Sequence, residues 1–391
     1  MIRSCTAGLT LACLQLACTE RGAAEMDRDS DADTSDSDAS SSSSSGPRPE
    51  PACGADGRHA GTAFIATNDD ALALRGCTTI DGDLIIDPCP ECEGDPCGAC
   101  SPADALTSLQ GLEDLRDVTG TLQIGWDLNR FEDDDEWRGP TALSSLAPLS
   151  GLERVGGDLW LAAAPSVTEA DFSSLRTVGG DVVSAHSFGS EARFPRLATA
   201  QSLIFVGRAW SEFSAPSLQS VDGVSLTDTD ITSLSGLAEL DAIETSLSLS
   251  RNRLLANVPF GALPQLQSVG LSEVPLISGV DLSAAHPRSS RIQRCASVAV
   301  VDGGGIESMD LLWLVDSPIV EASFTDLQSV DDSLWIVQTS LSSLEGFSAV
   351  QSIGARLEIV QNPNLCQSEA LAFAERFEGI DWVTVEDNAD C

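Results

Sequence analysis

The chain has 391 residues, of which 60 are acidic and 21 are Lys or Arg, and its formal net charge at pH 7 is −39. A charge of this size repels phosphate backbones, so we expect no nucleic-acid partner. All 21 of these basic residues are Arg, and the absence of Lys excludes Schiff-base chemistry. The hydrophobic content of 42% is ordinary for a protein with a folded core.

Residues 1–17 are typical of an export signal. Arg3 precedes an apolar run from Thr6 to Ala17, which is too short to span a bilayer. The run leads into Cys18 and resembles a bacterial lipobox, although Gln15 stands where that pattern has an aliphatic residue. Cys18 would then carry lipid, and cleavage after Ala17 without lipidation is the alternative. We therefore expect a protein anchored by lipid at a bacterial outer membrane or cell surface, or else a secreted one.

Residues 18–52 are predicted to form a disordered stalk behind that anchor. They are rich in Asp and Ser and have almost no large apolar side chain, so burial cannot offset the entropy of ordering them. The alternating aspartates of Asp27–Asp33 superficially resemble a calcium loop. The Gly and Glu that would complete an EF-hand are missing, which favours a solvated linker.

Two cysteine pairs flank the predicted ends of the folded region, residues 53–391. A disulfide is expected within each pair: Cys53 with Cys77, and Cys366 with Cys391. The first pair encloses a short helix whose start is signalled by Thr67. The second encloses a helix at Ser368–Phe377 and a last strand at Trp382–Val385. Each disulfide would secure a terminal cap and contribute about 3 kcal/mol.

A cysteine-rich insertion is predicted at residues 88–101. Its four cysteines form two C-x-x-C units: Cys89, Cys92, Cys97 and Cys100. Four thiolates could bind zinc, but an exported protein meets an oxidising compartment, and we favour two disulfides. Cys295 is then left over, either buried as a small apolar residue or available for an intermolecular bond. We expect no metal and no cofactor.

A short phrase with one apolar-x-apolar strand recurs every 22 or 23 residues through most of the chain. The strands are predicted at these positions: Leu122–Ile124, Leu159–Leu161, Leu203–Phe205, Leu247–Leu249, Leu312–Leu314, Leu334–Ile336 and Leu357–Ile359. Alternation sends each flanking pair inward and the middle residue outward. The pattern predicts a mainly β solenoid of coils of 22–25 residues, either a β-helix or leucine-rich-repeat-like. Strands between 275 and 310 are not assigned.

Three tryptophans occupy outward strand positions: Trp160, Trp313 and Trp335. Trp313 and Trp335 are 22 residues apart, so they should lie side by side on neighbouring coils. Exposed aromatic rings suit a sugar or a protein partner, and the alternative is that another segment covers them. A second insertion, residues 129–142, carries a run of acids that is expected to be a solvated loop. The three histidines are too far apart in sequence to indicate a metal site.

The predicted caps resemble those of a known family. The helix followed by Leu74–Ile86, and the close at Asn362–Cys366 with a helix and Cys391, are similar to receptor L domains in their bacterial lipoprotein branch. These domains are the ligand-binding solenoids of the insulin and epidermal growth factor receptors. The resemblance covers residues 53–391 and implies a right-handed β-helix-like solenoid with a binding role. Receptor signalling does not carry over, because no furin-like module, transmembrane helix or kinase is present.

The sequence therefore predicts a non-catalytic lipoprotein that binds an unknown protein or glycan. A β-helix polysaccharide-degrading enzyme is the first alternative, since that fold stacks coils of similar length. The outward strand positions, including Gln123, Ser248 and Glu358, lack the clustered acids and bases that such an enzyme uses. A purely structural surface protein is the second alternative.

Overall fold

The structure is a computed structural model of the chain. It describes residues 53–86, 106–125, 142–185 apart from 163, 165 and 168, 191–207, 211–234, 240, 242–256, 258 and 266–391. The predicted signal and stalk, with Cys18, lie outside these residues, as do the cysteines at 89–100 and residues 129–141. Residues 49–391 form one compact unit.

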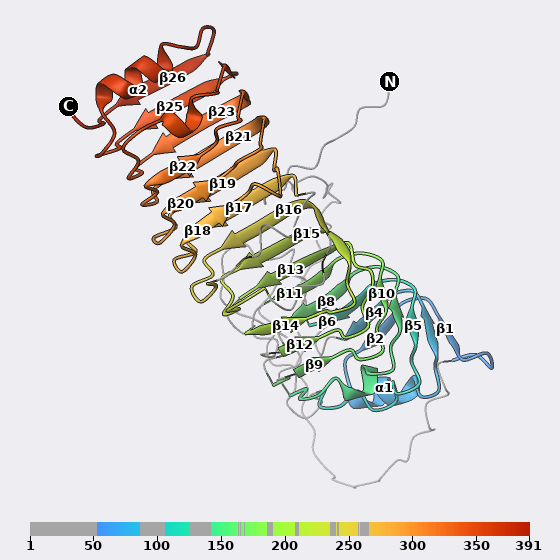
Figure 1. The fold of residues 1–391 in the computed structure, drawn as a ribbon. Coiled ribbons are helices and arrows are strands. Elements are labelled where there is room, and N and C mark those ends of the chain that lie inside the picture. The colour runs from blue at the N-terminus through green and yellow to red at the C-terminus, as the bar shows by residue number, and fades with distance from the viewer. Residues whose placement is uncertain are drawn as a thin grey trace, which may run out of the picture. The chain divides into compact units, whose positions relative to one another are not determined.

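The fold is a parallel β-solenoid of about 12 turns at a spacing of about 22 residues, with 39% strand and 7% helix. This confirms the predicted class. In the largest sheet the strands of successive coils stack in sequence order (Figure 1). Its strands are β2 (Ala63–Ile65), β4 (Leu84–Ile86), β6 (Leu122–Ile124), β8 (Leu159–Ala162), β11 (Val182–Ala185), β13 (Ser202–Val206), β15 (Ser220–Thr227), β16 (Ala242–Ser250), β17 (Ser268–Ser272), β19 (Ser289–Gln293), β21 (Ser308–Val315), β23 (Ser329–Val337), β24 (Ser352–Ile353), β25 (Arg356–Val360) and β26 (Trp382–Glu386). β24 and β25 of one coil both pair with β23.

Smaller parallel sheets cover the other sides of the coils. The first contains β1 (Arg58–Ala60), β3 (Thr79–Asp81), β5 (Asp117–Val118), β7 (Arg154–Val155) and β10 (Thr177–Val178). The second contains β9 (Glu169–Asp171), β12 (Glu191–Arg193) and β14 (Glu212–Ser214), and the third β18 (Gly279–Asp281), β20 (Val300–Asp302) and β22 (Glu321–Ser323). Short 3₁₀ turns lie at Ala147–Leu149 and Glu345–Phe347.

The core follows the predicted alternation. In β21 and β23 the flanking leucines and isoleucine are fully buried, while Trp313 and Trp335 between them are only partly buried. Aromatic rings stack from coil to coil inside the solenoid, as for Phe324 and Phe347, whose centroids are 5.4 Å apart. Each coil therefore buries its apolar pair against the next, which is how a solenoid grows without one large core.

The structure also assigns the strands between 275 and 310. β18 and β20 lie in a side sheet, and β19 and the start of β21 lie in the main sheet. The sequence pattern missed β19 because Ser290 occupies an inward position, in register with Val269 and Leu312, where other coils carry an aliphatic residue. Cys295, just beyond β19, is fully buried and free, and burial raises the pKa of its thiol.

Both predicted caps are present. α1 (Asn68–Ala73) begins after Thr67, whose hydroxyl accepts the Asp70 N–H in a capping box. Disulfides join Cys53 to Cys77 and Cys366 to Cys391, as predicted.

The C-terminal elements differ slightly from their predicted bounds. α2 (Gln367–Ala374) is shorter than predicted, because the bonds from Arg376 N–H to Phe373 O and from Phe377 N–H to Ala374 O span three residues and tighten the chain into turns. β26 runs one residue further than predicted, to Glu386.

Candidate functional site

One row of outward positions runs across the whole main sheet. Strand register places these residues side by side in order: Phe64, Ile85, Gln123, Trp160, Val183, Ile204, Ser225, Ser248, Gly270, Arg291, Trp313, Trp335, Glu358 and Thr384. All three predicted tryptophans belong to this row. Six strands separate Trp160 from Trp313, so the structure brings together Trp313 and Trp335 but not Trp160. The Trp160 Nε1 donates to Asp158 Oδ2 at 3.3 Å.

Trp313 and Trp335 stack on each other, as their spacing predicted. Their ring centroids are 4.1 Å apart and their planes differ by 7°. The Arg291 guanidinium lies 4.5 Å from the Trp313 centroid on the side away from Trp335, and Arg356 lies 5.6 Å from the Trp335 centroid on the other side. Neighbouring side chains therefore occupy the ring faces, and the surface presents ring edges.

The indole N–H groups of this stack are shielded from solvent. The Nε1 atoms of Trp313 and Trp335 are buried, and neither has a hydrogen-bond partner among the described residues. A sugar recognised by tryptophan needs an open ring face, which the stack does not offer. The pair is better placed to support the surface beside it than to hold a glycan.

That neighbouring surface is built by the turns that follow the strands. In eight consecutive coils the first residue after the strand is not Gly, yet has φ between 46° and 57°: Asp228, Arg251, Glu273, Arg294, Asp316, Gln338, Gln361 and Asp387. This left-handed conformation bends the chain sharply. In two earlier coils Gly125 and Gly207 hold the same place, with φ of 83° and 105°.

A ladder of buried polar side chains fixes these turns from inside. Asn362 Oδ1 accepts the N–H and hydroxyl of Thr339 at 3.0 and 2.6 Å, and its Nδ2 donates to Ile336 O at 2.9 Å. Five coils earlier, Asn252 Oδ1 accepts the N–H and hydroxyl of Thr229, and its Nδ2 donates to Leu226 O. Satisfied buried amides hold the turn backbones in one geometry. The left-handed residue that precedes each of these buried side chains, such as Gln338 before Thr339 and Gln361 before Asn362, thereby has its own side chain directed outward.

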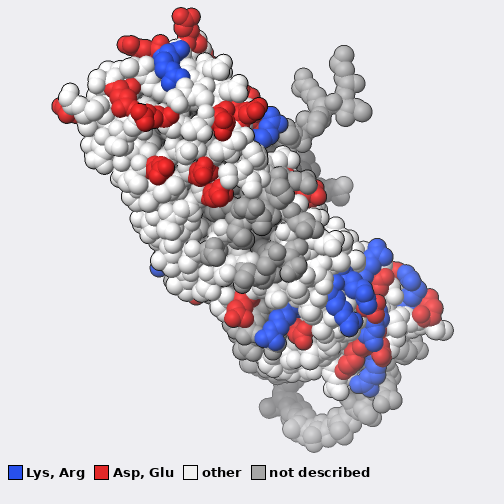
Figure 2. All heavy atoms as spheres, viewed as in Figure 1, with Lys and Arg blue, Asp and Glu red and all other residues white. Residues whose placement is uncertain are grey.

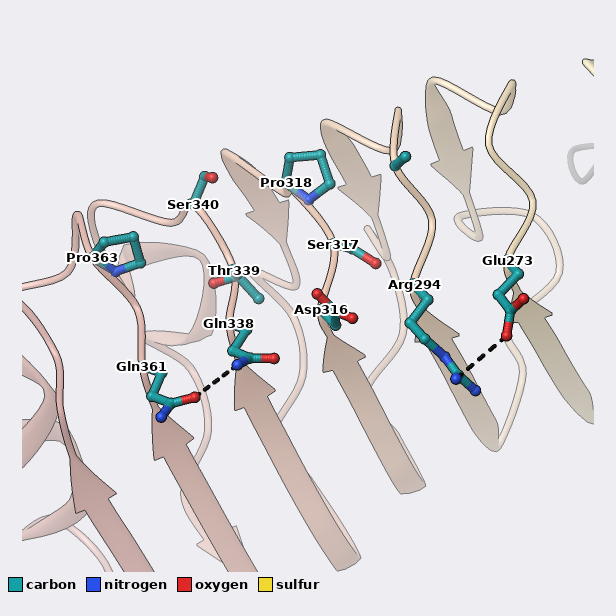
Figure 3. A pocket seen from close by; sticks show the side chains of 11 residues that line it. Glu273, Arg294, Asp316, Ser317, Pro318, Gln338, Thr339, Ser340, Gln361 and Pro363 are labelled. Carbon is teal, nitrogen blue, oxygen red and sulfur yellow. Dashed lines mark hydrogen bonds and ion pairs between the residues drawn. The ribbon is translucent and has the colours of Figure 1, made fainter.

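An open groove with a volume of about 910 Å³ runs along five of these turns (Figure 3). Its lining residues are Glu273, Arg294, Ala296, Asp316, Ser317, Pro318, Gln338, Thr339, Ser340, Gln361 and Pro363. We call it the strand-end groove. The left-handed residues, one from each successive strand, form one side of the groove. The residues two positions further along the chain, such as Pro318 and Pro363, form the other side.

Polar contacts preorganise part of the strand-end groove. Arg294 Nη1 lies 3.3 Å from Glu273 Oε1, and Gln338 Nε2 donates to Gln361 Oε1 at 2.7 Å. Asp316 lies between these two pairs and has no ion pair among the described residues. The groove thus offers a carboxylate and two amides in a row to a ligand that runs across the strands.

The surrounding coils are strongly acidic. Residues 295–391 contain 17 Asp and Glu but only two basic residues, Arg356 and Arg376, which gives a formal charge of −15. Figure 2 shows acidic side chains scattered over these coils, whereas near the other end of the solenoid arginines alternate with acids. A cationic partner would be steered toward the C-terminal coils.

Sequence reasoning found the tryptophans but missed the strand-end groove. The available signal was a polar residue directly after the strand, recurring over eight consecutive coils, as with Gln338 and Gln361. In the part of the chain that the structure describes, no group of three or more His, Cys, Asp or Glu is arranged to hold a metal. Nor is any described helix long and apolar enough to cross a membrane.

Comparison with known proteins adds no relative. No protein-family model matches the chain, and no curated protein or solved structure matches it either.

Proposed function

We propose that residues 53–391 are a non-catalytic module that binds a partner protein in the strand-end groove. The observation that carries the proposal is the repetition of one outward polar position over five coils, along an open groove. Such a surface suits an extended chain that meets equivalent contacts roughly every 4.8 Å along the sheet. The receptor-L resemblance, which implies a binding role, agrees with this proposal.

Two observations favour a protein over a glycan. The faces of Trp313 and Trp335 are occupied by each other and by arginines, so they are closed to stacked sugar rings. The charge of −15 on residues 295–391 gives a cationic protein an electrostatic gain that a neutral glycan lacks. An anionic glycan would be repelled.

The proposed address is outside the cell, by the lipid on Cys18. Two disulfides in the caps are consistent with folding in an oxidising compartment. Lipid, acidic stalk and solenoid would then present the groove away from the membrane.

A binding screen tests this function. The full chain is immobilised and exposed separately to envelope-protein extract and to envelope polysaccharide. The test variant is Asp316→Gly/Gln338→Gly/Gln361→Gly, which removes groove side chains while Gly keeps the left-handed turns without strain. We expect the native chain to retain a protein from the extract and the triple variant to retain at least tenfold less of it. We expect that polysaccharide is neither retained nor depolymerised.

The matched control changes the same residue types near the starts of β23 and β24, away from the groove: Gln328→Gly, Asp331→Gly and Gln351→Gly. These residues are exposed and outside the groove. Retention that both triple variants lose equally, or that neither loses, would count against the groove. Depolymerised polysaccharide would instead support the enzyme alternative.

A further inference from the structure

β26 is the last strand of the main sheet and has a neighbour on one side only. It pairs with β25, and no other strand of the described chain pairs with it. Figure 1 shows β26 at the end of the stack. A free strand edge presents backbone N–H and C=O groups to an incoming extended segment.

The free backbone groups of this edge centre on Val383, because the next open-side carbonyl, Val385 O, already accepts from Gln367 Nε2 at 2.9 Å. Trp382 N–H donates to Ala355 O at 3.1 Å, and Glu386 O accepts from Gln361 N–H at 3.1 Å. Residues 382, 384 and 386 therefore turn their backbone groups toward β25. Because successive residues of a strand turn these groups to opposite sides, Val383 turns its N–H and C=O toward the open side.

The side chain of Val383 is also incompletely covered. It shares an inward row with Leu312, Leu334 and Leu357, which are all 0% exposed, whereas Val383 is 50% exposed. Each earlier coil is covered by the strand that follows it. An apolar side chain on an added strand would cover Val383 in the same way.

Trp382 supplies a contact for a positive charge at this edge. It is 59% exposed, and Arg356 on the β25 side lies 5.9 Å from its ring centroid. The same kind of contact, an Arg guanidinium over a Trp ring, is made elsewhere on this surface by Arg291 and Trp313. The face of Trp382 toward the open side has no strand beside it in the described chain. Arg or Lys of a partner there would also meet the acidic charge of these coils.

We propose that β26 accepts an extended, cationic segment of a partner protein as an added strand. The segment carries an apolar residue beside Val383 and Arg or Lys beside Trp382. A second copy of the chain is a poorer occupant, because its own net charge of −39 opposes the approach. The inference deepens the proposed protein-binding function, but it uses the edge of β26 and not the strand-end groove.

The test measures binding of a short labelled peptide of alternating Arg and Val to the full chain by fluorescence anisotropy. Val383→Pro removes the open-side N–H and leaves the bonds to β25 in place, since Pro is tolerated on an edge strand. Val383→Ala keeps that N–H and is the matched control for the lost side chain. We expect Val383→Pro to weaken binding about tenfold more than Val383→Ala.

Other results would overturn the proposal. These are no binding of the alternating peptide, equal affinities of the Pro and Ala variants, or equal binding of a peptide with the same Arg and Val in two blocks. Self-association of the free chain that Val383→Pro abolishes would assign the edge to a second copy instead. Should Val383→Pro not fold, a peptide N-methylated at alternate residues tests the same hydrogen bonds on the native chain, and unchanged affinity would again contradict strand addition.

The groove triple variant separates this proposal from the function itself. It should bind the alternating peptide as the native chain does, because the groove and the edge of β26 do not share residues. Loss of peptide binding in that variant would place the peptide in the groove and overturn the edge assignment.

Discussion

Asp181 is a carboxylate whose surroundings oppose its charge. Its pKa is raised first by burial and then by the neighbouring Asp158, although hydrogen bonds from Ser202 act in the opposite direction. A folded-state pKa above the unfolded one means that the folded state binds more protons. The ionised group therefore destabilises the fold at neutral pH, and this penalty shrinks as the pH falls below the folded pKa and is gone below the unfolded pKa.

Replacing this carboxylate should stabilise the fold at neutral pH. We expect Asp181→Asn to raise the free energy of unfolding by about 0.5 kcal/mol at pH 7, a modest gain because solvent screens a half-buried group. The gain should shrink in acid. Denaturant unfolding at several pH values measures it, with the exposed Asp331→Asn as the control for a change in net charge. A gain in the free energy of unfolding that grows as the pH falls would contradict a raised pKa for Asp181.

Ser290 is a second residue whose polar side chain is expected to destabilise the fold. Its hydroxyl is buried in an apolar row and has no hydrogen-bond partner among the described residues. We expect Ser290→Ala to raise the free energy of unfolding by about 1 kcal/mol, because an unpaired buried hydroxyl is removed. Ser184→Ala is the matched control: Ser184 is equally buried, but its hydroxyl donates to Leu161 O at 3.2 Å, so its loss should destabilise. Equal effects of the two substitutions would contradict this account.

At the scale of the elements, the buried amide ladder should dominate the stability of the turns. Asn362 is fully buried and bonds across coils, whereas Asn364 is exposed and makes one bond of 3.3 Å to Ser340 O. We expect Asn362→Ala to lower the free energy of unfolding by about 3 kcal/mol and Asn364→Ala by less than about 0.5 kcal/mol. Thermal and denaturant unfolding compare them, and similar losses would argue against the ladder.

The C-terminal cap is the element most dependent on a covalent bond. The Cys366–Cys391 disulfide closes a segment of 25 residues that contains α2 and β26. Replacing both cysteines by serine should cost the cap about 3.5 kcal/mol in the chain-entropy model. Because solenoid coils contact mainly their neighbours, the effect should stay local. Hydrogen exchange should quicken in residues 367–386 and stay unchanged in β21, and a uniform change along the chain would contradict it.

The elements also show what the sequence could predict. The apolar-x-apolar strands were predictable because alternation at the core is a period-2 signal, as in Leu334–Ile336. The caps were predictable because Cys spacing and the Thr67 N-cap are local signals. The strand-end groove was harder to predict, since the polar residues after eight strands adopt φ > 0 although none of them is Gly, and a polar residue alone does not indicate that conformation. The closed ring faces of the Trp313–Trp335 pair depend on Arg291 and Arg356, which register, and not local sequence, places beside them.

At the scale of the whole solenoid, stacking converts one residue position into a surface. Gln338 alone is an exposed amide, but its equivalents on neighbouring coils make a groove across five turns. The same stacking concentrates charge, because residues 295–391 hold 17 acids against two arginines. A linear, acidic, open surface is what the proposed recognition of an extended cationic protein requires.

The binding site can be located by hydrogen exchange of the full chain, with and without the envelope-protein fraction that it retains. We expect slower exchange at the turns of the strand-end groove, residues 294–296, 316–318, 338–340 and 361–363, and no change in the coils before residue 207. Slowing confined to those earlier coils, or no slowing anywhere when the fraction is bound, would contradict the proposal that this groove is the binding site.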